Sequence, residues 1–189
     1  MRTFVAIEIE QNLKEKIYKF ITTSQAQIKS NKISWVKKEN LHVTLKFIGE
    51  IEEKKVENIK EVLNKLIKNF TQFSFSIRNI GVFPDVKKPR VIWLGIEDKT
   101  KILGLLSKEI EDELFKIGLP KENKEFVSHL TIGRIKNLTN VSEIEKYIRG
   151  NPNTDFGENK VEFITFFQSI LKPEGPTYIP IEKFYLKNL

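Results

Sequence analysis

The sequence contains one structural pattern twice, and this repetition limits the folds that the chain can adopt. Each half is expected to run strand, helix, strand, helix, strand, with a histidine in its middle strand. Val5 precedes His42 by 37 positions, and Trp93 precedes His129 by 36 positions. Two copies of one unit usually pack about a pseudo-two-fold axis, which brings equivalent residues face to face. We therefore expect the two histidines to meet, although the offsets alone also fit a coincidence among common α/β spacings.

The expected elements follow from apolar periodicity along the chain. In the first half, strands are predicted at residues 3–9, 41–49 and 73–77, and helices at 11–29 and 53–69. In the second half, strands are predicted at 91–96, 126–135 and 161–171, and helices at 101–117 and 141–149. Segment 81–90 contains glycine and two prolines and is expected to be an exposed loop. A turn at Pro173–Pro176 is expected to lead to a last strand near 178–187.

Composition excludes several kinds of site. A chain of 189 residues fits one domain, or two small ones that share a core. The sequence has no cysteine, which rules out disulfides, thiolate nucleophiles and thiolate metal sites, and it has only two histidines. The net charge of +7 favours polyanionic partners, nucleic acid first, but a solvated lysine-rich surface explains it equally well.

Both histidines stand in the same short motif. His42 belongs to H-V-T-L and His129 to H-L-T-I, so Thr44 and Thr131 each follow a histidine by two positions. Residues i and i+2 of a strand share one face, and the residues between them point the other way. Each motif should therefore present an imidazole and a hydroxyl on one surface, with aliphatic side chains behind them.

Two such pairs suit acid–base catalysis on a phosphodiester. One neutral histidine can accept a proton from the attacking hydroxyl or water, while the other, protonated, donates to the leaving oxygen. An ordinary pKa near 6.5 lets both forms coexist around neutrality, and the threonine hydroxyls can donate to the non-bridging oxygens. A metal site fits poorly, because Glu39 and Glu125 are the only carboxylates within four positions of His42 and His129. A purely structural, hydrogen-bonded role for both histidines is the alternative.

The motifs and their surroundings resemble the two-histidine phosphoesterase superfamily, and more closely the RNA 2′,3′-cyclic phosphodiesterases, also labelled 2′-5′ RNA ligases. Besides the two motifs, the resemblance rests on R-T-F-V-A-I at 2–7, W-V-K-K-E-N-L-H-V-T-L-K-F-I-G-E at 35–50, G-V-F-P at 81–84, P-R-V-I-W-L-G at 89–95 and S-H-L-T-I-G-R at 128–134. Together these segments are distributed over residues 2–134 of the chain.

The resemblance implies an α+β fold with two pseudo-symmetric lobes. Each lobe would be a mainly antiparallel sheet with helices on its outside, and the two histidine strands would line a central cleft. We expect one bilobal domain over 1–189, with an approximate repeat of 3–80 and 91–171 and with 172–189 completing the sheets. Glutamates at positions 8 and 10 interrupt any apolar signal sequence. We therefore expect a cytoplasmic protein without a membrane segment. We also expect it to be a monomer.

The resemblance also implies a reaction and its catalytic residues. The reaction is hydrolysis of an RNA 2′,3′-cyclic phosphate end, including ends derived from tRNA, to a 2′-phosphate by cleavage of the bond to O3′. His42 would be the general acid that protonates O3′, and His129 the general base that activates water. Thr44 and Thr131 would hold the phosphate oxygens, with no cofactor and no metal. Ligation would be the same chemistry with an RNA 5′-hydroxyl in place of water, forming a 2′-5′ bond.

Arg134 is a candidate substrate-binding residue. It follows His129 by five positions and matches a basic residue that the family uses near the phosphate. Strict alternation would turn its side chain away from the His129 face, so this role requires a strand end or a β-bulge, which Gly133 permits. An ordinary surface arginine is the alternative.

Phe83 and Lys46 are further candidates for substrate binding. Phe83 precedes Pro84 and could stack on the terminal base, since such stacking needs no particular base, or it could anchor the loop as a core residue. Lys46 shares the face of His42 and Thr44 if the strand is regular, and would then add positive charge to the cleft.

Two other classes of function stay open. One is a phosphodiesterase for small cyclic nucleotides, ADP-ribose cyclic phosphate or 2′-5′ oligonucleotides. The other is a non-catalytic basic RNA-binding module whose histidines are only structural. Intact motifs at both His42 and His129 favour an enzyme over a binding module.

Overall fold

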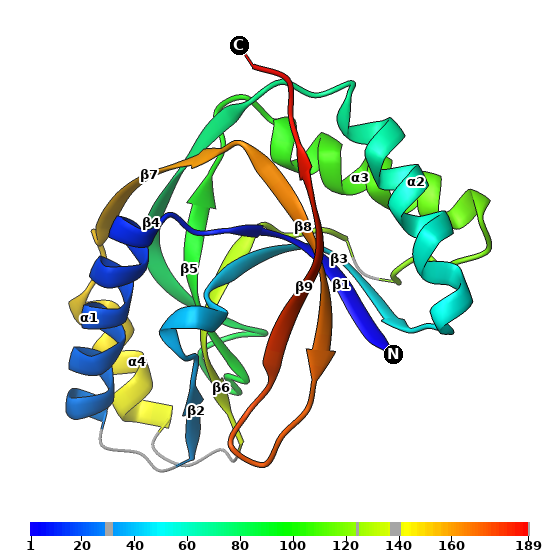
Figure 1. Ribbon diagram of the computed structural model, residues 1–189. Helices are drawn as coiled ribbons and strands as arrows, with labels where there is room; N and C mark the ends of the chain where they lie inside the picture. Colours follow the sequence, from blue (N-terminus) through cyan, green and yellow to red (C-terminus); the bar gives the residue numbers. More distant parts are fainter. Residues whose placement is uncertain (29–31, 124, 137–140, 189) are drawn as a thin grey trace.

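The computed structural model describes residues 1–28, 32–123, 125–136 and 141–188 (Figure 1). Within these residues the chain forms four α-helices and nine strands. The helices are α1 (Gln11–Ile28), α2 (Val56–Ile67), α3 (Ile102–Lys116) and α4 (Val141–Gly150). The strands are β1 (Arg2–Glu8), β2 (Ile33–Trp35), β3 (His42–Glu50), β4 (Phe73–Phe83), β5 (Val91–Glu97), β6 (His129–Ile135), β7 (Asp155–Val161), β8 (Phe163–Ile170) and β9 (Thr177–Tyr185).

The strands form two antiparallel sheets with matching strand orders. One sheet has the order β3-β1-β8-β9, and the other has the order β2-β6-β5-β4-β7. If β2 is set aside, each sheet begins with the strand that carries its histidine, β3 or β6. The next strand is the first strand of the same half of the chain, β1 or β5. The strand after that comes from the other half, because β8 pairs with β1 and β4 pairs with β5. The predicted α+β fold with two pseudo-symmetric antiparallel sheets is therefore confirmed.

Helices cover the two sheets on opposite sides of the molecule. Figure 1 shows α1 and α4 together on one side, and α2 and α3 together on the other. Each pair buries an apolar stripe with helical spacing, represented by Ile17 and Ile21 in α1 and by Ile110 and Leu114 in α3. The histidine strands β3 and β6 lie side by side between the helix pairs. This arrangement leaves the two histidines between the sheets.

The expected elements agree with the structure except at four places. The strand expected at 73–77 continues to Phe83, so the exposed loop starts at Pro84 and not at Gly81. The strand expected at 126–135 begins only at His129. The strand expected at 161–171 is β8, and the strands β7 and β2 were not expected. The last residue of the helix expected at 11–29 lies outside the described residues.

The two unexpected strands, β7 and β2, have weak local sequence signals. Strand β7 reads D-F-G-E-N-K-V and lies at the edge of its sheet, so it needs no continuous apolar pattern. Strand β2 pairs only with β6, and its three residues are too few for a periodic signal. Both strands form through hydrogen bonds to partner strands that lie far away in the sequence, β6 for β2 and β4 for β7.

A glycine in β4 lets a tryptophan ring lie flat on the sheet. Gly81 pairs with Trp93 of β5, and a Cβ atom on Gly81 would lie only 2.3 Å from the indole ring. Phe83 packs against the same indole, with 5.0 Å between the ring centroids. The positions of both aromatic rings therefore depend on the absence of a side chain at Gly81.

We expect Gly81→Ala to lower the free energy of unfolding by about 1–3 kcal/mol, because overpacking a filled site forces neighbouring groups to move. Gly104→Ala is the matched control, since Gly104 is exposed on α3 and a Cβ there meets nothing within 4 Å. Removal of a helix-interior glycine should raise stability by up to about 1 kcal/mol. Chemical denaturation measures both variants, and a Gly81→Ala protein as stable as the wild type would contradict the packing described.

Candidate active site between the two sheets

Both histidine rings are held by a backbone carbonyl two residues earlier in the chain. The Nδ1 atom of His42 donates to the carbonyl oxygen of Asn40, and that of His129 donates to the carbonyl oxygen of Val127, each at 2.7 Å. A carbonyl oxygen only accepts hydrogen bonds, so the proton of the neutral ring resides on Nδ1 in both cases. The Nε2 atoms of the neutral rings are then unprotonated and can accept a proton.

Each threonine lies on the same face of its strand as its histidine. In the first sheet, His42 pairs with Glu8 and Thr44 pairs with Ala6. Glu8 and Ala6 are two positions apart on β1 and therefore lie on the same face. The Nε2 atom of His42 lies 3.1 Å from the Thr44 hydroxyl oxygen, which donates to it when the ring is neutral. In the second sheet, Thr131 occupies the equivalent position on β6, two residues after its histidine.

A β-bulge brings Arg134 onto the face of His129. Thr131 pairs with Trp93 and Arg134 pairs with Val91, so three steps along β6 correspond to two steps along β5. Trp93 and Val91 share a face because β5 alternates regularly, and Arg134 therefore shares the face of Thr131. The β-bulge that the sequence analysis required for Arg134 to face the site is thus present. The Arg134 side chain is exposed.

Strand β3 has a bulge at the same distance from its histidine. Thr44 pairs with Ala6 and Phe47 pairs with Phe4, so three steps along β3 correspond to two along β1. Phe47 therefore joins the histidine face, and Lys46 turns to the opposite side. The two bulges make Phe47 of β3 the structural counterpart of Arg134 of β6.

The expectation that Lys46 shares the face of His42 is wrong, because the strand is not regular there. The Lys46 side chain is only 3% exposed. Its ammonium group donates to Glu111 of α3 at 2.7 Å and to the carbonyl oxygen of Pro120 at 3.1 Å. These contacts tie β3 to the helix layer, so Lys46 is a candidate for stabilising the fold and not for binding substrate.

Aromatic rings surround both histidines. Phe83 meets the ring of His129 edge to face, with 5.1 Å between the centroids, so it lies beside a histidine and not in the loop. On the other sheet, Phe4 and Tyr178 approach the His42 ring at 5.0 and 5.1 Å. The sequence patterns did not single out Phe4 or Tyr178 as site residues, because no motif links them to His42.

The surroundings of both histidines disfavour the charged ring. Burial lowers the pKa of His42 to about 4, against the opposing effect of its hydrogen bond to Asn40. Burial also lowers the pKa of His129. The positive charge of Arg134 lowers both pKa values further. Without a ligand, both rings are therefore neutral at pH 7. The sequence analysis assumed an ordinary pKa near 6.5 for both rings, and the structure lowers both pKa values. An anion bound between the rings would reverse the effect.

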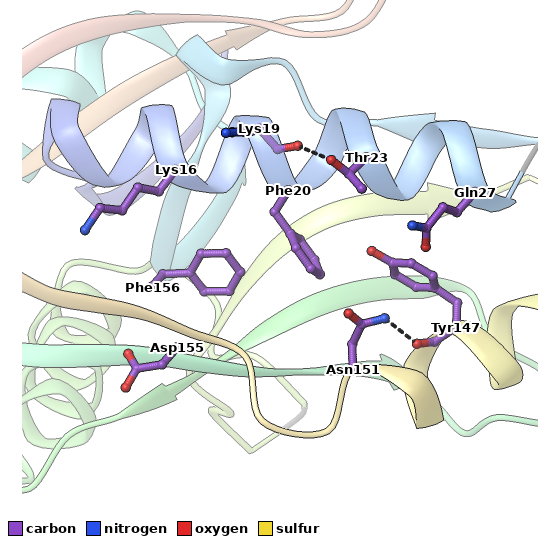
Figure 2. A pocket seen from close by; sticks show the side chains of 9 residues that line it. All are labelled: Lys16, Lys19, Phe20, Thr23, Gln27, Tyr147, Asn151, Asp155 and Phe156. Carbon is purple, nitrogen blue, oxygen red and sulfur yellow. Dashed lines mark hydrogen bonds between the residues drawn. The ribbon is translucent and has the colours of Figure 1, made fainter.

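A small cavity adjoins His42, and a larger one lies away from the histidines. The cavity beside His42 has a volume of about 200 Å³, and Glu8, Lys14, Tyr178 and Lys183 are among its lining residues. Figure 2 shows the larger cavity, about 420 Å³, where α1 faces α4 and β7. None of the predicted site residues lines this larger cavity. The candidate site is therefore the region around the two histidines.

Two further findings concern metals and membranes. Over residues 1–28, 32–123, 125–136 and 141–188, no group of three or more histidine, cysteine, aspartate or glutamate residues is arranged to hold a metal ion. In the same part of the chain, no helix has the length and apolar character that crossing a bilayer requires.

Comparison with known proteins gives consistent matches over the whole chain. The model of the family described as LigT-like phosphoesterase matches twice, at residues 7–93 and 94–178. A relative from Methanocaldococcus jannaschii named RNA 2′,3′-cyclic phosphodiesterase is 40% identical, over 97% of this chain and 100% of that protein. A relative of the same name from Methanothermobacter thermautotrophicus is 32% identical, over 98% of this chain and 99% of that protein.

Solved structures agree with this assignment. The crystal structure of TT0787 from Thermus thermophilus is similar with a TM-score of 0.81 and 26% identity, over 100% of this chain and 99% of that chain. The matches confirm the resemblance to the two-histidine phosphoesterases and the prediction of an enzyme. The double family match and the two matching histidine strands lead to one conclusion: the chain belongs to the LigT-like phosphoesterase family.

Proposed function

We propose that the protein hydrolyses RNA 2′,3′-cyclic phosphate ends to 2′-phosphates. The observation that carries this proposal is the matched pair of histidines, each with Nδ1 held by a backbone carbonyl and Nε2 left for proton transfer. Arg134 adds a positive charge that acts on both rings. The two relatives named RNA 2′,3′-cyclic phosphodiesterase support the choice of substrate.

In the proposed reaction the two histidines have different roles. His129 takes a proton on Nε2 from a water molecule that attacks the phosphorus atom. His42, protonated on Nε2, donates that proton to O3′ as the P–O3′ bond breaks, and the phosphate stays on O2′. The hydroxyl groups of Thr44 and Thr131, together with Arg134, stabilise the charge on the non-bridging oxygens. None of these steps needs a metal ion.

Substrate binding must also favour the charged form of His42. Burial holds the pKa of this ring at about 4, so the free protein at pH 7 carries it as the neutral imidazole. A bound phosphodiester has a negative charge, and an anion close to an imidazole raises its pKa. The substrate phosphate therefore helps to create the acid that protonates its own leaving group.

The same site can support ligation. An RNA 5′-hydroxyl that replaces water gives its proton to His129, attacks the phosphorus atom and displaces O3′, which His42 protonates. The product is a 2′-5′ phosphodiester bond, and no group beyond those of hydrolysis is required.

We expect His42→Ala and His129→Ala each to lower kcat for an RNA with a 2′,3′-cyclic phosphate end by about 10²–10⁴-fold, because each removes one proton-transfer group. Chromatography of the 2′-phosphate product measures the rate, and circular dichroism checks the fold. RNA binding should be largely retained in both variants. Normal turnover in either variant would contradict the acid–base roles and would favour a binding module with structural histidines.

We expect a bell-shaped dependence of kcat/KM on pH, with its maximum on the acid side of pH 6.5. The active form has one protonated and one neutral imidazole, and kcat/KM follows the pKa values of the free enzyme. Both pKa values lie below 6.5, and His42 titrates at about 4. The bound phosphate raises them, so the maximum of kcat should lie at higher pH. A kcat/KM maximum above pH 7, or identical kcat and kcat/KM profiles, would contradict this account.

We expect hydrolysis to survive prolonged treatment with EDTA. The proposed donors and acceptors are imidazole, hydroxyl and guanidinium groups, and the reaction needs no Lewis acid. The rate after chelation, with and without added Mg²⁺, Mn²⁺ or Zn²⁺, is the measurement. Loss of activity that one of these ions restores would identify a metal-dependent hydrolase instead.

A further inference from the structure

Strand β3 carries an exposed aromatic ring where β6 carries a guanidinium group. The matched bulges place Phe47 and Arg134 at equivalent positions, each on the same face as its histidine. The Phe47 side chain is 41% exposed. Phe47 therefore occupies, on the first sheet, the position that Arg134 occupies on the second, and the proposed hydrolysis gives Phe47 no role.

A second guanidinium group lies over this ring. The Cζ atom of Arg2 lies 4.9 Å from the centroid of Phe47, within the range of a cation–π contact. The register with β3 shifts between Thr3 and Phe4, but the extra residue lies on β3, and β1 pairs with β8 without a shift at these two positions. Arg2 and Phe4 therefore share one face of β1. Arg2 supported by Phe47 thus provides, on the first sheet, the kind of charge that Arg134 provides on the second.

Arg2 has no carboxylate within ion-pair distance in the part of the chain that the structure describes. The acidic residue opposite Arg2, and another that contacts the backbone of Phe47, are engaged elsewhere. Glu50, which pairs with Arg2 across the strands, lies 3.2 Å from the amino group of Met1. Glu122 accepts a hydrogen bond from the backbone N–H of Phe47 at 2.9 Å. The donors of Arg2 are therefore available to an external anion.

Arg2 also lies on the side of the molecule where the candidate site is. Phe4, two residues after Arg2 on the same face of β1, meets the ring of His42 at 5.0 Å and the ring of Tyr178 at 4.9 Å. The positive charge of Arg2 also lowers the pKa of Tyr178, against the larger effect of burial. The ring of Tyr178 in turn meets His42 at 5.1 Å. Arg2 therefore lies on the strand face that carries the aromatic rings beside His42, and the proposed hydrolysis does not use it.

We propose that Arg2 binds the phosphodiester group on the 5′ side of the terminal nucleotide, and that Phe47 positions its guanidinium group. This inference rests on the proposed function, in which the cyclic phosphate lies between the histidines. A guanidinium group presents paired N–H donors that match phosphate oxygens, and stacking on a ring restricts its orientation before the substrate arrives. The contact would make the enzyme favour RNA ends over free cyclic mononucleotides without reading a base.

The test compares two substrates that differ by one 5′ adenosine and the phosphodiester that joins it to the terminal nucleotide. Adenosine 2′,3′-cyclic monophosphate lacks it, and the dinucleotide ApA with a terminal 2′,3′-cyclic phosphate contains it. We expect Arg2→Gln to lower kcat/KM for the dinucleotide by about tenfold to a hundredfold, the effect of losing one charge-assisted contact. For the mononucleotide, kcat/KM should stay within about twofold of the wild type.

Three further variants sharpen the comparison. Arg149→Gln is the matched control, because Arg149 is an exposed arginine on α4 that is already paired with Glu145 at 2.7 Å, and it should affect neither substrate. Arg2→Lys should restore part of the dinucleotide rate because it keeps the charge. Phe47→Leu should reduce only the dinucleotide rate, and by less than Arg2→Gln, because the charge remains but its support is lost.

Salt dependence gives an independent measurement. If Arg2 contacts one phosphate, Arg2→Gln should make the fall of log kcat/KM with log salt shallower by about 0.7 for the dinucleotide and leave it unchanged for the mononucleotide. Equal losses on both substrates, or an unchanged dinucleotide rate, would overturn the inference.

Failure of the proposed function can be told apart from failure of this inference. A wild-type protein that hydrolyses neither substrate would refute the proposed function. The contact is then tested by equilibrium binding of ApA with a terminal 2′-phosphate, and equal affinity of the wild type and Arg2→Gln would overturn it.

Discussion

The exchange of one strand between the two halves of the chain is the constraint on which the other features depend. Strand β4 of the first half pairs with β5 of the second, and β8 of the second half pairs with β1 of the first. Neither half can complete its sheet alone, so the two sheets must form together. The exchange fixes β3 and β6 as neighbours, and it thereby places His42 and His129 in one site. A reaction that needs an acid and a base on opposite sides of a phosphate follows from this topology.

The matched bulges add a third functional position to each motif. A regular strand would present residues one, three and five of the run that begins at the histidine, whereas the bulge makes the sixth residue face the site. On β6 the sixth residue is Arg134, and on β3 it is Phe47. The residue before it turns to the opposite face, where Lys46 pairs with Glu111. Its counterpart Gly133 is buried against β2, where a Cβ atom would lie 3.2 Å from both Ile33 and Trp35. The backbone is thus symmetric while the chemistry of the two sides differs.

Much of the fold and the centre of the site could be predicted from local patterns. Helical and strand periodicity located most elements, and the repeated spacing brought His42 and His129 together, because both signals lie within short stretches of sequence. The bulge at Lys46, the extension of β4 to Phe83 and the short strand β2 could not be predicted, because each depends on register with a distant strand. The same limit applies to Phe4 and Tyr178, which reach His42 from neighbouring strands. The lowered histidine pKa values depend on this packing and were missed for the same reason.

The central claim is that water attacks the phosphorus atom while the site protonates O3′ and keeps the phosphate on O2′, so that the two ester oxygens of the cyclic phosphate are not interchangeable. The chemical identity of the product tests this claim most directly. An RNA with a 2′,3′-cyclic phosphate end is incubated with the protein in ¹⁸O-labelled water, and the product is analysed by ³¹P NMR spectroscopy and mass spectrometry. The account predicts a 2′-phosphate that contains one labelled oxygen atom. A 3′-phosphate, or a mixture of the two isomers, would contradict it.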